Sequence, residues 1–308
     1  MPDYSKLIDA DTWDFIRETE KWYPPDSTDQ NITKHRQRYD MMCRAFFRGC
    51  PDSVSATDIV SGKVPLRIYR RKNSLQEATV LFCHGGSFML GGLDSHDDIC
   101  AEICDATGYD VVAVDYRLNP EFTHKDALND VQLALDWIAQ DRGGPVIGVG
   151  DSAGGFLIAG TVHSNRATGD IAGQVLIYPG LYFRTDGGSM DEHAFAPLLT
   201  KAEILSARSL PDEIEPQLPQ IAVDLQNLPV TIAMSAQCDP IADDAQNYVK
   251  AINNAGGTAF WFEDKGLVHG HLRARHSVKR ARVSFDRVLQ AISLIGSGIT
   301  VTRARLEN

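Results

Sequence analysis

The sequence has little positive charge, no long apolar run and no cluster of cysteines, and each absence excludes a class of function. The chain of 308 residues has 30 Lys and Arg against 41 Asp and Glu, a formal net charge of -11. Nucleic acids and anionic membranes are bound by basic faces, so neither is expected as a partner. No stretch has the apolar length of a signal peptide or a membrane span, and we therefore expect a cytoplasmic protein.

The cysteines have no spacing typical of metal ligands. They are Cys43, Cys50, Cys83, Cys100, Cys104 and Cys238. Cys100 and Cys104 lie four residues apart, on one face of an expected helix. In a cytoplasmic chain, two small buried side chains are a better interpretation of this pair than a disulfide or a metal site. The sequence therefore predicts no metal site.

What the sequence does contain is a regular alternation of apolar strands and amphipathic helices. Strands are predicted over residues 58–60, 64–70, 79–83, 110–114, 145–149, 173–178, 230–235 and 259–262, the first two as a hairpin. Helices are predicted over residues 97–106, 126–139, 242–254 and 277–294, with another directly after residue 152. This alternation is typical of an α/β fold with a mostly parallel central sheet and helices on both faces.

Two regions interrupt the alternation. Residues 1–50 are predicted to form two helices, the first capped by Asp11 or Thr12. The buried face of the second comprises Ile32, Tyr39, Met42, Cys43, Phe46 and Phe47. Residues 181–222 are polar and contain several prolines, with one expected helix over 201–209. We expect a small helical cap from both regions on a domain of residues 51–308, although an ordinary helical appendage is an equally good interpretation of residues 1–50.

Residues 150–155, Gly-Asp-Ser-Ala-Gly-Gly, place a serine at the junction of an apolar strand and a helix. A serine in so sharp a turn has strained backbone angles, and the glycine two residues to either side avoids a collision with the neighbouring strand or helix. This is the context of a nucleophile elbow, which exposes the hydroxyl above the sheet. Ser152 is therefore the candidate nucleophile, although the short motif also arises by chance in a chain with 25 glycines.

Further polar residues follow strands at the same edge of the predicted sheet, where α/β proteins bind their ligands. Asp239 follows the strand 230–235, and His269 follows the strand 259–262. A neutral His269 can take the proton of Ser152 during attack and return it to the leaving group, while Asp239 orients the imidazole and stabilises its charged form. The order Ser, Asp, His along the chain is the one expected of an α/β-type hydrolase.

The glycines after the strand 79–83 are candidates for a second task. A tetrahedral intermediate carries an oxyanion, which needs preorganised N–H donors. The predicted topology makes the backbone N–H groups of Gly85, Gly86 and Ala153 the candidate donors. His84, directly before them, is expected to have a structural role in this loop.

Several residues compete for these roles. His271 lies two residues after His269 and is the rival base, but the glycine after His269 favours the latter by permitting a tight loop. Asp243 and Asp244 are rivals of Asp239, yet they stand where a helix begins, and an interaction with its dipole explains them. His96 and His124 have no spacing that implicates them, so exposed or capping positions are expected.

Taken together, these motifs support a family resemblance. They are His84-Gly85-Gly86, the segment Tyr116-Arg117-Leu118-Asn119-Pro120-Glu121, Gly150 to Gly155, Asp239-Pro240 and His269-Gly270. In combination they resemble the hormone-sensitive-lipase-like family of α/β-hydrolases, over nearly the whole chain. The resemblance implies the α/β-hydrolase fold, a triad of Ser152, Asp239 and His269, an oxyanion hole of Gly85, Gly86 and Ala153, a cap that shapes the acyl and alcohol pockets, and no cofactor.

The sequence also departs from the family pattern. Ser87 stands where the family often has a third glycine, and Asn119 replaces a usual alanine. His271 stands where phenylalanine often follows His-Gly, so the rival base is not eliminated. Neither glycine predicted as an oxyanion donor is altered by these departures.

The expected function is hydrolysis of short-chain carboxylic esters through an acyl-enzyme intermediate, with a small-molecule ester as the substrate. An amidase or formamidase with the same triad is the alternative, and a non-catalytic ligand-binding protein on the same scaffold is a third hypothesis. Candidate pocket residues are Ser87, Phe88, Met89, Phe183 and Phe195. A homodimer is expected only from the frequency of such assemblies.

Overall fold

The computed structural model describes residues 2–23, 31–72, 74, 78–181, 186–208 and 224–307. Its centre is an eight-stranded sheet with the spatial order β1-β2-β4-β3-β5-β6-β7-β8. The strands are β1 Val54–Ser61, β2 Val64–Arg71, β3 Thr79–Cys83, β4 Asp110–Val114, β5 Val146–Asp151, β6 Ile171–Ile177, β7 Val230–Cys238 and β8 Ala259–Val268. β2 pairs antiparallel with β1 and β4, whereas the remaining pairs are parallel. The prediction of a mostly parallel sheet is confirmed.

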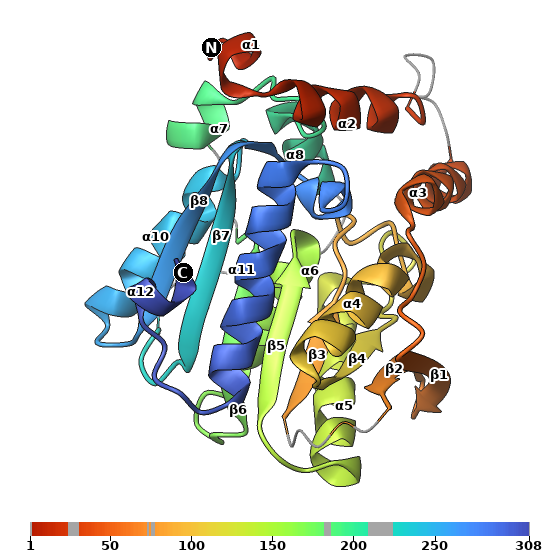
Figure 1. Cartoon of the computed structure of the whole chain (residues 1–308), viewed down its shortest axis with the longest axis vertical. Helices are drawn as coiled ribbons and strands as arrows, with labels where there is room; N and C mark the ends of the chain where they lie inside the picture. Colours follow the sequence, from red (N-terminus) through yellow and green to blue (C-terminus); the bar gives the residue numbers. More distant parts are fainter. Residues whose placement is uncertain are drawn as a thin grey trace.

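Helices cover both faces of this sheet. α4 (Asp97–Thr107) and α11 (Lys279–Gly296) lie in front of it in Figure 1 and share an apolar core with one face. α5 (His124–Asp141), α6 (Ala153–Ser164) and α10 (Ala242–Asn254) belong to the core on the opposite face. Because both faces are covered, β3 and β5 are buried at every position, which explains why they contain only apolar residues apart from Thr79 and Asp151 at their ends. No helix in the described ranges is both long and apolar enough to cross a membrane.

Additional helices lie above the carboxyl ends of the parallel strands, in the upper part of Figure 1. They are α1 (Tyr4–Leu7), α2 (Ala10–Glu20), α3 (Ile32–Phe46), α7 (Gly188–Glu192) and α8 (Lys201–Arg208). Phe15 on α2 and Phe46 on α3 share an apolar cluster with Val268 at the end of β8 and with Leu90 in the loop after β3. Leu198, between α7 and α8, packs against the same cluster. The N-terminal helices and the second irregular region therefore meet over the same edge of the sheet.

Three strands are markedly longer than predicted, among them β1, which spans Val54–Ser61 rather than residues 58–60. β7 ends at Cys238 and β8 at Val268, rather than at residues 235 and 262, and these two final residues pair with each other. In the extension of β8, exposed Glu263 and Lys265 flank buried Asp264. Because polar side chains fill this extension, it lacks the apolar signal by which the rest of the strand was predicted.

The predicted helix boundaries near the N-terminus are partly wrong. Asp9, rather than Asp11 or Thr12, caps α2, because its Oδ1 accepts the N–H of Thr12 at 3.0 Å. Thr12 is fully buried, and its packing favours a position within the helix rather than at the cap. Phe47 follows the last residue of α3 and is 42% exposed, and it therefore does not share the buried face of that helix.

Much of the predicted insertion lies outside the described residues, namely 182–185 and 209–223. Phe183 and the proline-containing loop belong to these ranges. Within the described part, α8 covers the predicted helix up to Arg208.

Candidate active site

Ser152 lies in a strained turn between β5 and α6. Its φ of 52° and ψ of -118° are rare for a residue with a side chain. A Cβ atom at Gly150 would lie 2.5 Å from the carbonyl of Gly154, and one at Gly154 would lie 2.0 Å from the carbonyl oxygen of Cys83. The two glycines are thus required by the close crossing of strand and helix, as the elbow motif predicts.

The structure brings Ser152, His269 and Asp239 together. His269 Nε2 lies 2.8 Å from Ser152 Oγ, and His269 Nδ1 lies 2.7 Å from Asp239 Oδ2. Asp239 is fully buried and accepts the N–H of Ile241 on its other oxygen at 3.0 Å. An ionised carboxylate can only accept, so Nδ1 carries the proton and Nε2 offers its lone pair to the serine hydroxyl. This is the tautomer that a general base requires.

The rival carboxylates point to other partners. Asp243 accepts the N–H of Ser189 at 2.9 Å, and Asp244 accepts the N–H of Leu181 at 2.8 Å. Both bonds connect the start of α10 to the segment after β6. The two side chains therefore hold the start of α10 against the segment after β6. Of the three carboxylates, only that of Asp239 is bonded to His269.

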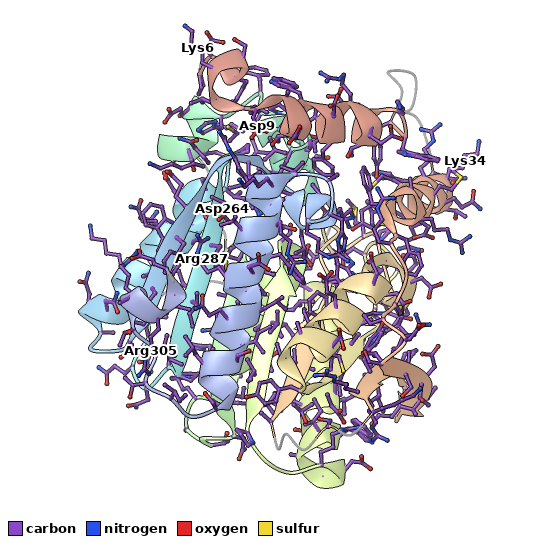
Figure 2. All side chains as sticks on the ribbon, viewed as in Figure 1. Lys6, Asp9, Lys34, Asp264, Arg287 and Arg305 are labelled. Carbon is purple, nitrogen blue, oxygen red and sulfur yellow. The ribbon has the colours of Figure 1, made fainter. Side chains whose placement is uncertain are left out.

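The rival histidine also has its hydrogen-bond partners outside the triad. His271 is 1% exposed, with Nδ1 3.0 Å from the carbonyl oxygen of Val268 and Nε2 3.2 Å from Ser284 Oγ. Ser284 donates to Asp264, which is paired with Arg287 at 2.8 Å, and Figure 2 shows these two charged residues side by side between β8 and α11. His271 thus connects the loop of His269 to the end of β8 and to α11.

One predicted oxyanion donor is already occupied. The N–H of Gly85 donates to Asp151 Oδ1 at 2.9 Å, so this group cannot serve a substrate, and the prediction for Gly85 is wrong. Among the described residues, no acceptor takes the N–H of Gly86, Ser87 or Ala153. Ala153 opens α6, where the first N–H groups have no partner within the helix.

Backbone strain marks the same loop. Gly86, Ser87 and Phe88 have successive φ values of 131°, 53° and 60°. The N–H groups of Met89 and Leu90 both donate to the carbonyl oxygen of Gly86, which closes the turn. Side chains at positive φ cost free energy, and such strain is concentrated at functional sites.

The predicted pocket residues occupy dissimilar positions. Phe88 is 3% exposed and packs edge-on against His124, at 4.3 Å between ring centroids, so it is a core residue. Phe195 is 71% exposed, which does not fit the wall of an enclosed pocket. Ser87 and Met89 are half-buried, and the carbonyl oxygen of Met89 accepts a bond from Arg36 on α3 at 2.8 Å.

Of the two positions expected for His96, exposed or capping, it takes the N-cap position of α4, but its side chain makes no capping hydrogen bond and is not exposed. It is 2% exposed and its Nε2 lies 3.2 Å from Asp151 Oδ1. Its helical spacing from Ile99, Cys100 and Ile103, which are all buried on α4, was the signal that could have placed it on the inward face. His84 is buried as expected: its ring stacks on Tyr116 at 4.4 Å.

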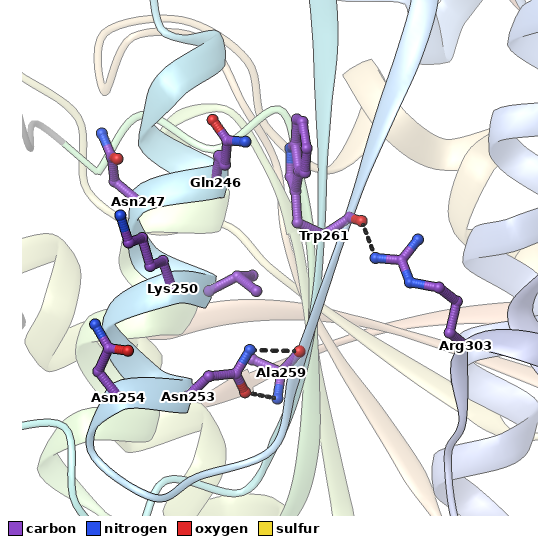
Figure 3. Close-up of a pocket in the computed structure, with 9 residues that line it drawn as sticks. Gln246, Asn247, Lys250, Asn253, Asn254, Ala259, Trp261 and Arg303 are labelled. Atoms are coloured by element: carbon purple, nitrogen blue, oxygen red, sulfur yellow. Dashed lines mark hydrogen bonds between the residues drawn. The ribbon is translucent and has the colours of Figure 1, made fainter.

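A separate cavity of about 430 Å³ lies at the start of β8, between α10 and the C-terminal helix α12 (Arg303–Leu306). Figure 3 shows that two of its polar side chains are used by the fold: Asn253 exchanges two hydrogen bonds with the backbone of Ala259, and Arg303 donates to the carbonyl oxygen of Trp261 at 2.9 Å. These bonds hold the edge strand, and no serine, cysteine or histidine is among the residues that line this cavity.

Comparison with known proteins agrees with this geometry. Residues 80–273 match the model of the α/β-hydrolase fold family. The chain is 32% identical over 261 residues to the esterase LipI of Mycobacterium tuberculosis, which covers 79% of this chain and 82% of that protein. It is 27% identical over 262 residues to an ethyl acetate hydrolase of Pseudomonas putida, with the same coverage of 79% and 82%.

Solved structures show the same likeness over almost the full length. A bacterial heroin esterase superposes with a TM-score of 0.81 at 27% sequence identity, covering 96% of this chain and 99% of that one. The sequence motifs, the sheet and these similarities lead to one conclusion: the chain belongs to the α/β-hydrolases and is a carboxylesterase.

Proposed function

We propose that the protein hydrolyses short-chain carboxylic esters through an acyl-enzyme intermediate on Ser152. The observation that carries the proposal is the hydrogen-bonded chain from Ser152 Oγ through His269 to Asp239. His269 Nε2 takes the hydroxyl proton as Ser152 attacks the ester carbonyl, and then gives it to the departing alcohol. A water molecule activated by the same nitrogen then releases the acid. Asp239 holds the ring and stabilises its charged form.

The oxyanion hole of this proposal consists of the N–H groups of Gly86, Ser87 and Ala153. It differs from the sequence prediction by the exchange of Gly85 for Ser87. Donation of the Gly85 N–H to Asp151 supports the exchange, as does the absence of another acceptor for the three remaining groups within the described ranges. Ser87 contributes through its backbone, so the loss of the family's third glycine does not remove a donor.

A short acyl chain is supported by the crowding above the site. The cluster of α2 and α3 reaches Val268, directly before His269, and Leu90 in the oxyanion loop. We infer that these helices, with the described part of residues 181–222, form the cap that limits the acyl pocket. The name of the ethyl acetate hydrolase relative is consistent with a small ester substrate.

The test is a chromogenic ester series from acetate through octanoate to palmitate, with Ser152→Ala measured beside the wild type. Acetate and butyrate should turn over fast, palmitate should not, and the variant should lose at least about 10,000-fold in kcat, as expected for a lost nucleophile. Normal turnover by Ser152→Ala would refute the proposal. If the wild type cleaves the matching anilides but no ester, amide hydrolysis by the same residues replaces it.

A further inference from the structure

Asp151, the residue before Ser152, directs its carboxylate at the loop that follows β3. The side chain is 2% exposed, and its Oδ1 accepts the N–H of Gly85 at 2.9 Å. A Cβ atom at position 85 would lie 2.5 Å from Asp151 Oδ2, so this close approach requires glycine. The strand that carries the nucleophile is thereby joined to the loop that carries Gly86 and Ser87.

The carbonyl group of Gly85 is also held in place by hydrogen bonds. Its oxygen lies 2.8 Å from His84 Nδ1 and accepts a longer bond, of 3.5 Å, from the hydroxyl of Tyr39 on α3. Burial lowers the pKa of His84 to about 4, so its ring is neutral at pH 7 and Nδ1 is the donor. Because the peptide unit is planar and trans, a fixed Gly85 carbonyl also fixes the opposite direction of the Gly86 N–H.

A second side chain lies next to the same carboxylate oxygen. His96 Nε2 lies 3.2 Å from Asp151 Oδ1, and His96 Nδ1 lies 2.8 Å from Ser95 Oγ. If Nε2 had no proton, its lone pair would face the lone pairs of a carboxylate inside the protein. Nε2 therefore carries a proton, and because the ring is not aligned for a hydrogen bond, its contact with Asp151 is an electrostatic one. The single oxygen Oδ1 thus joins β5, the loop after β3 and the start of α4.

Asp151 stays ionised in this buried position. Burial alone would raise its pKa, but the charges of His96 and Arg273 and the bond from Gly85 hold the pKa of Asp151 well below its usual value. Arg273 lies four residues after His269, and its guanidinium covers the ring of Tyr39 at 5.0 Å from the centroid. The charge is therefore compensated from the loop of His269.

From these contacts we infer that Asp151 is a positioning residue, which aligns the Gly86 and Ser87 N–H groups with Ser152 by accepting the Gly85 N–H on Oδ1. The inference rests on the ester hydrolysis proposed above. Asp151 is 2% exposed, and it makes no hydrogen bond with Ser152, His269 or Asp239, which are all described residues. A misaligned donor weakens the binding of the oxyanion more than that of the ester, so the effect belongs in kcat rather than in KM.

Two substitutions of Asp151 distinguish the role of its hydrogen-bond acceptor from the role of its negative charge. Asp151→Asn removes the charge and keeps an oxygen at Oδ1, whereas Asp151→Leu removes both at similar volume. For an acetate ester, kcat should fall about 100-fold or more in Asp151→Leu but less than about tenfold in Asp151→Asn, because a lost oxyanion donor costs about 100- to 1,000-fold. KM should stay within about threefold in both variants. Asp151→Ala serves the same purpose if the leucine variant does not fold.

Asp130→Leu is the matched control. Asp130 is also 2% exposed and also accepts a backbone N–H, that of Arg117, at 2.9 Å. Its loss should lower the melting temperature and leave kcat near the wild-type value. Hydrogen exchange of the peptide over residues 84–90 then measures the Gly85 bond without any ester. Exchange should quicken in Asp151→Leu, but not in Asp151→Asn or in the control.

The outcomes distinguish the inference from the proposed function. Wild-type kcat in Asp151→Leu, or equal losses of kcat in the leucine and asparagine variants, would overturn the positioning role. A wild type that is inert on every ester would overturn the esterase proposal. In that case hydrogen exchange still decides the inference, which fails if the loop is equally protected in Asp151→Leu and in the wild type.

Discussion

Two buried Asp–His pairs flank the nucleophile elbow, and they differ in what each ring nitrogen meets. In the first, Nδ1 of His269 lies 2.7 Å from Asp239, and its Nε2 faces Ser152. In the second, Nε2 of His96 lies 3.2 Å from Asp151, and its Nδ1 faces Ser95.

The two pairs also differ in the solvent exposure of their histidines. The His269 side chain is 14% exposed, whereas that of His96 is 2% exposed. A base needs a free lone pair next to the reacting group and a route for substrate, and only His269 has both. The same residue types in the second pair compensate charge and fix a loop. Local geometry rather than residue identity decides which pair performs chemistry.

The largest expected effect of breaking the first pair comes from Asp239→Asn. The amide would turn a donor toward His269 and favour the tautomer with its proton on Nε2, which cannot accept from Ser152. We expect kcat to fall about 10,000-fold with little change in stability, by analogy with serine hydrolases in general. Steady-state kinetics on an acetate ester provide the measurement. Asp243→Asn, at the rival position, should stay within about threefold, and a similar loss there would contradict the assignment.

Breaking the second pair should affect stability more than catalysis. His96→Leu leaves the Asp151 carboxylate without its buried ion-pair partner, which typically costs about 3–5 kcal/mol. Urea unfolding should show this loss, while kcat falls by less than about tenfold, because the bond from Gly85 remains. His96→Gln, which can donate from its amide, should recover part of the stability. A loss of kcat as large as in Asp239→Asn would erase the distinction between the pairs.

A smaller effect is expected from His84, which touches the oxyanion loop but belongs to neither pair. Burial lowers its pKa to about 4, below the unfolded value of 6.5. The unfolded chain then binds more protons between these values, so the contribution of neutral His84 is complete above pH 6.5 and is lost as the pH falls toward 4. The loss amounts to about 2–3 kcal/mol. Urea unfolding from pH 4 to 7 should therefore show a shallower dependence in His84→Gln, and equal slopes would contradict this account.

The mostly parallel sheet was predictable from the alternation of strands and helices, and the candidate triad because the carboxyl ends of parallel strands meet at one edge of the sheet. Ser152, Asp239 and His269 each follow such a strand, so residues up to 117 positions apart in the chain could be expected together. The direction of single side chains was not predictable. Gly85 appeared to be an oxyanion donor until the structure placed the Asp151 carboxylate, 66 residues away, on its N–H.

Polar residues limited the prediction elsewhere. The extension of β8 was missed because the charged residues at its start are satisfied by partners distant in sequence, which no local pattern reveals, whereas the burial of His96 was missed although its helical spacing from Ile99 and Ile103 indicated it. Phe88 was expected in the pocket from its place beside the glycines, yet its positive φ turns the chain and its ring lies in the core. The cytoplasmic location and the homodimer stay predictions.

The central claim, that Ser152 carries the acyl group, is tested most directly by mass spectrometry of the protein quenched during turnover of a butyrate ester. The account predicts one butyryl group on the peptide that contains Ser152 in the wild type, with a burst of alcohol release of matching amount, and none in Ser152→Ala. Steady hydrolysis without any acylated peptide, or an acyl group on another residue, would contradict it.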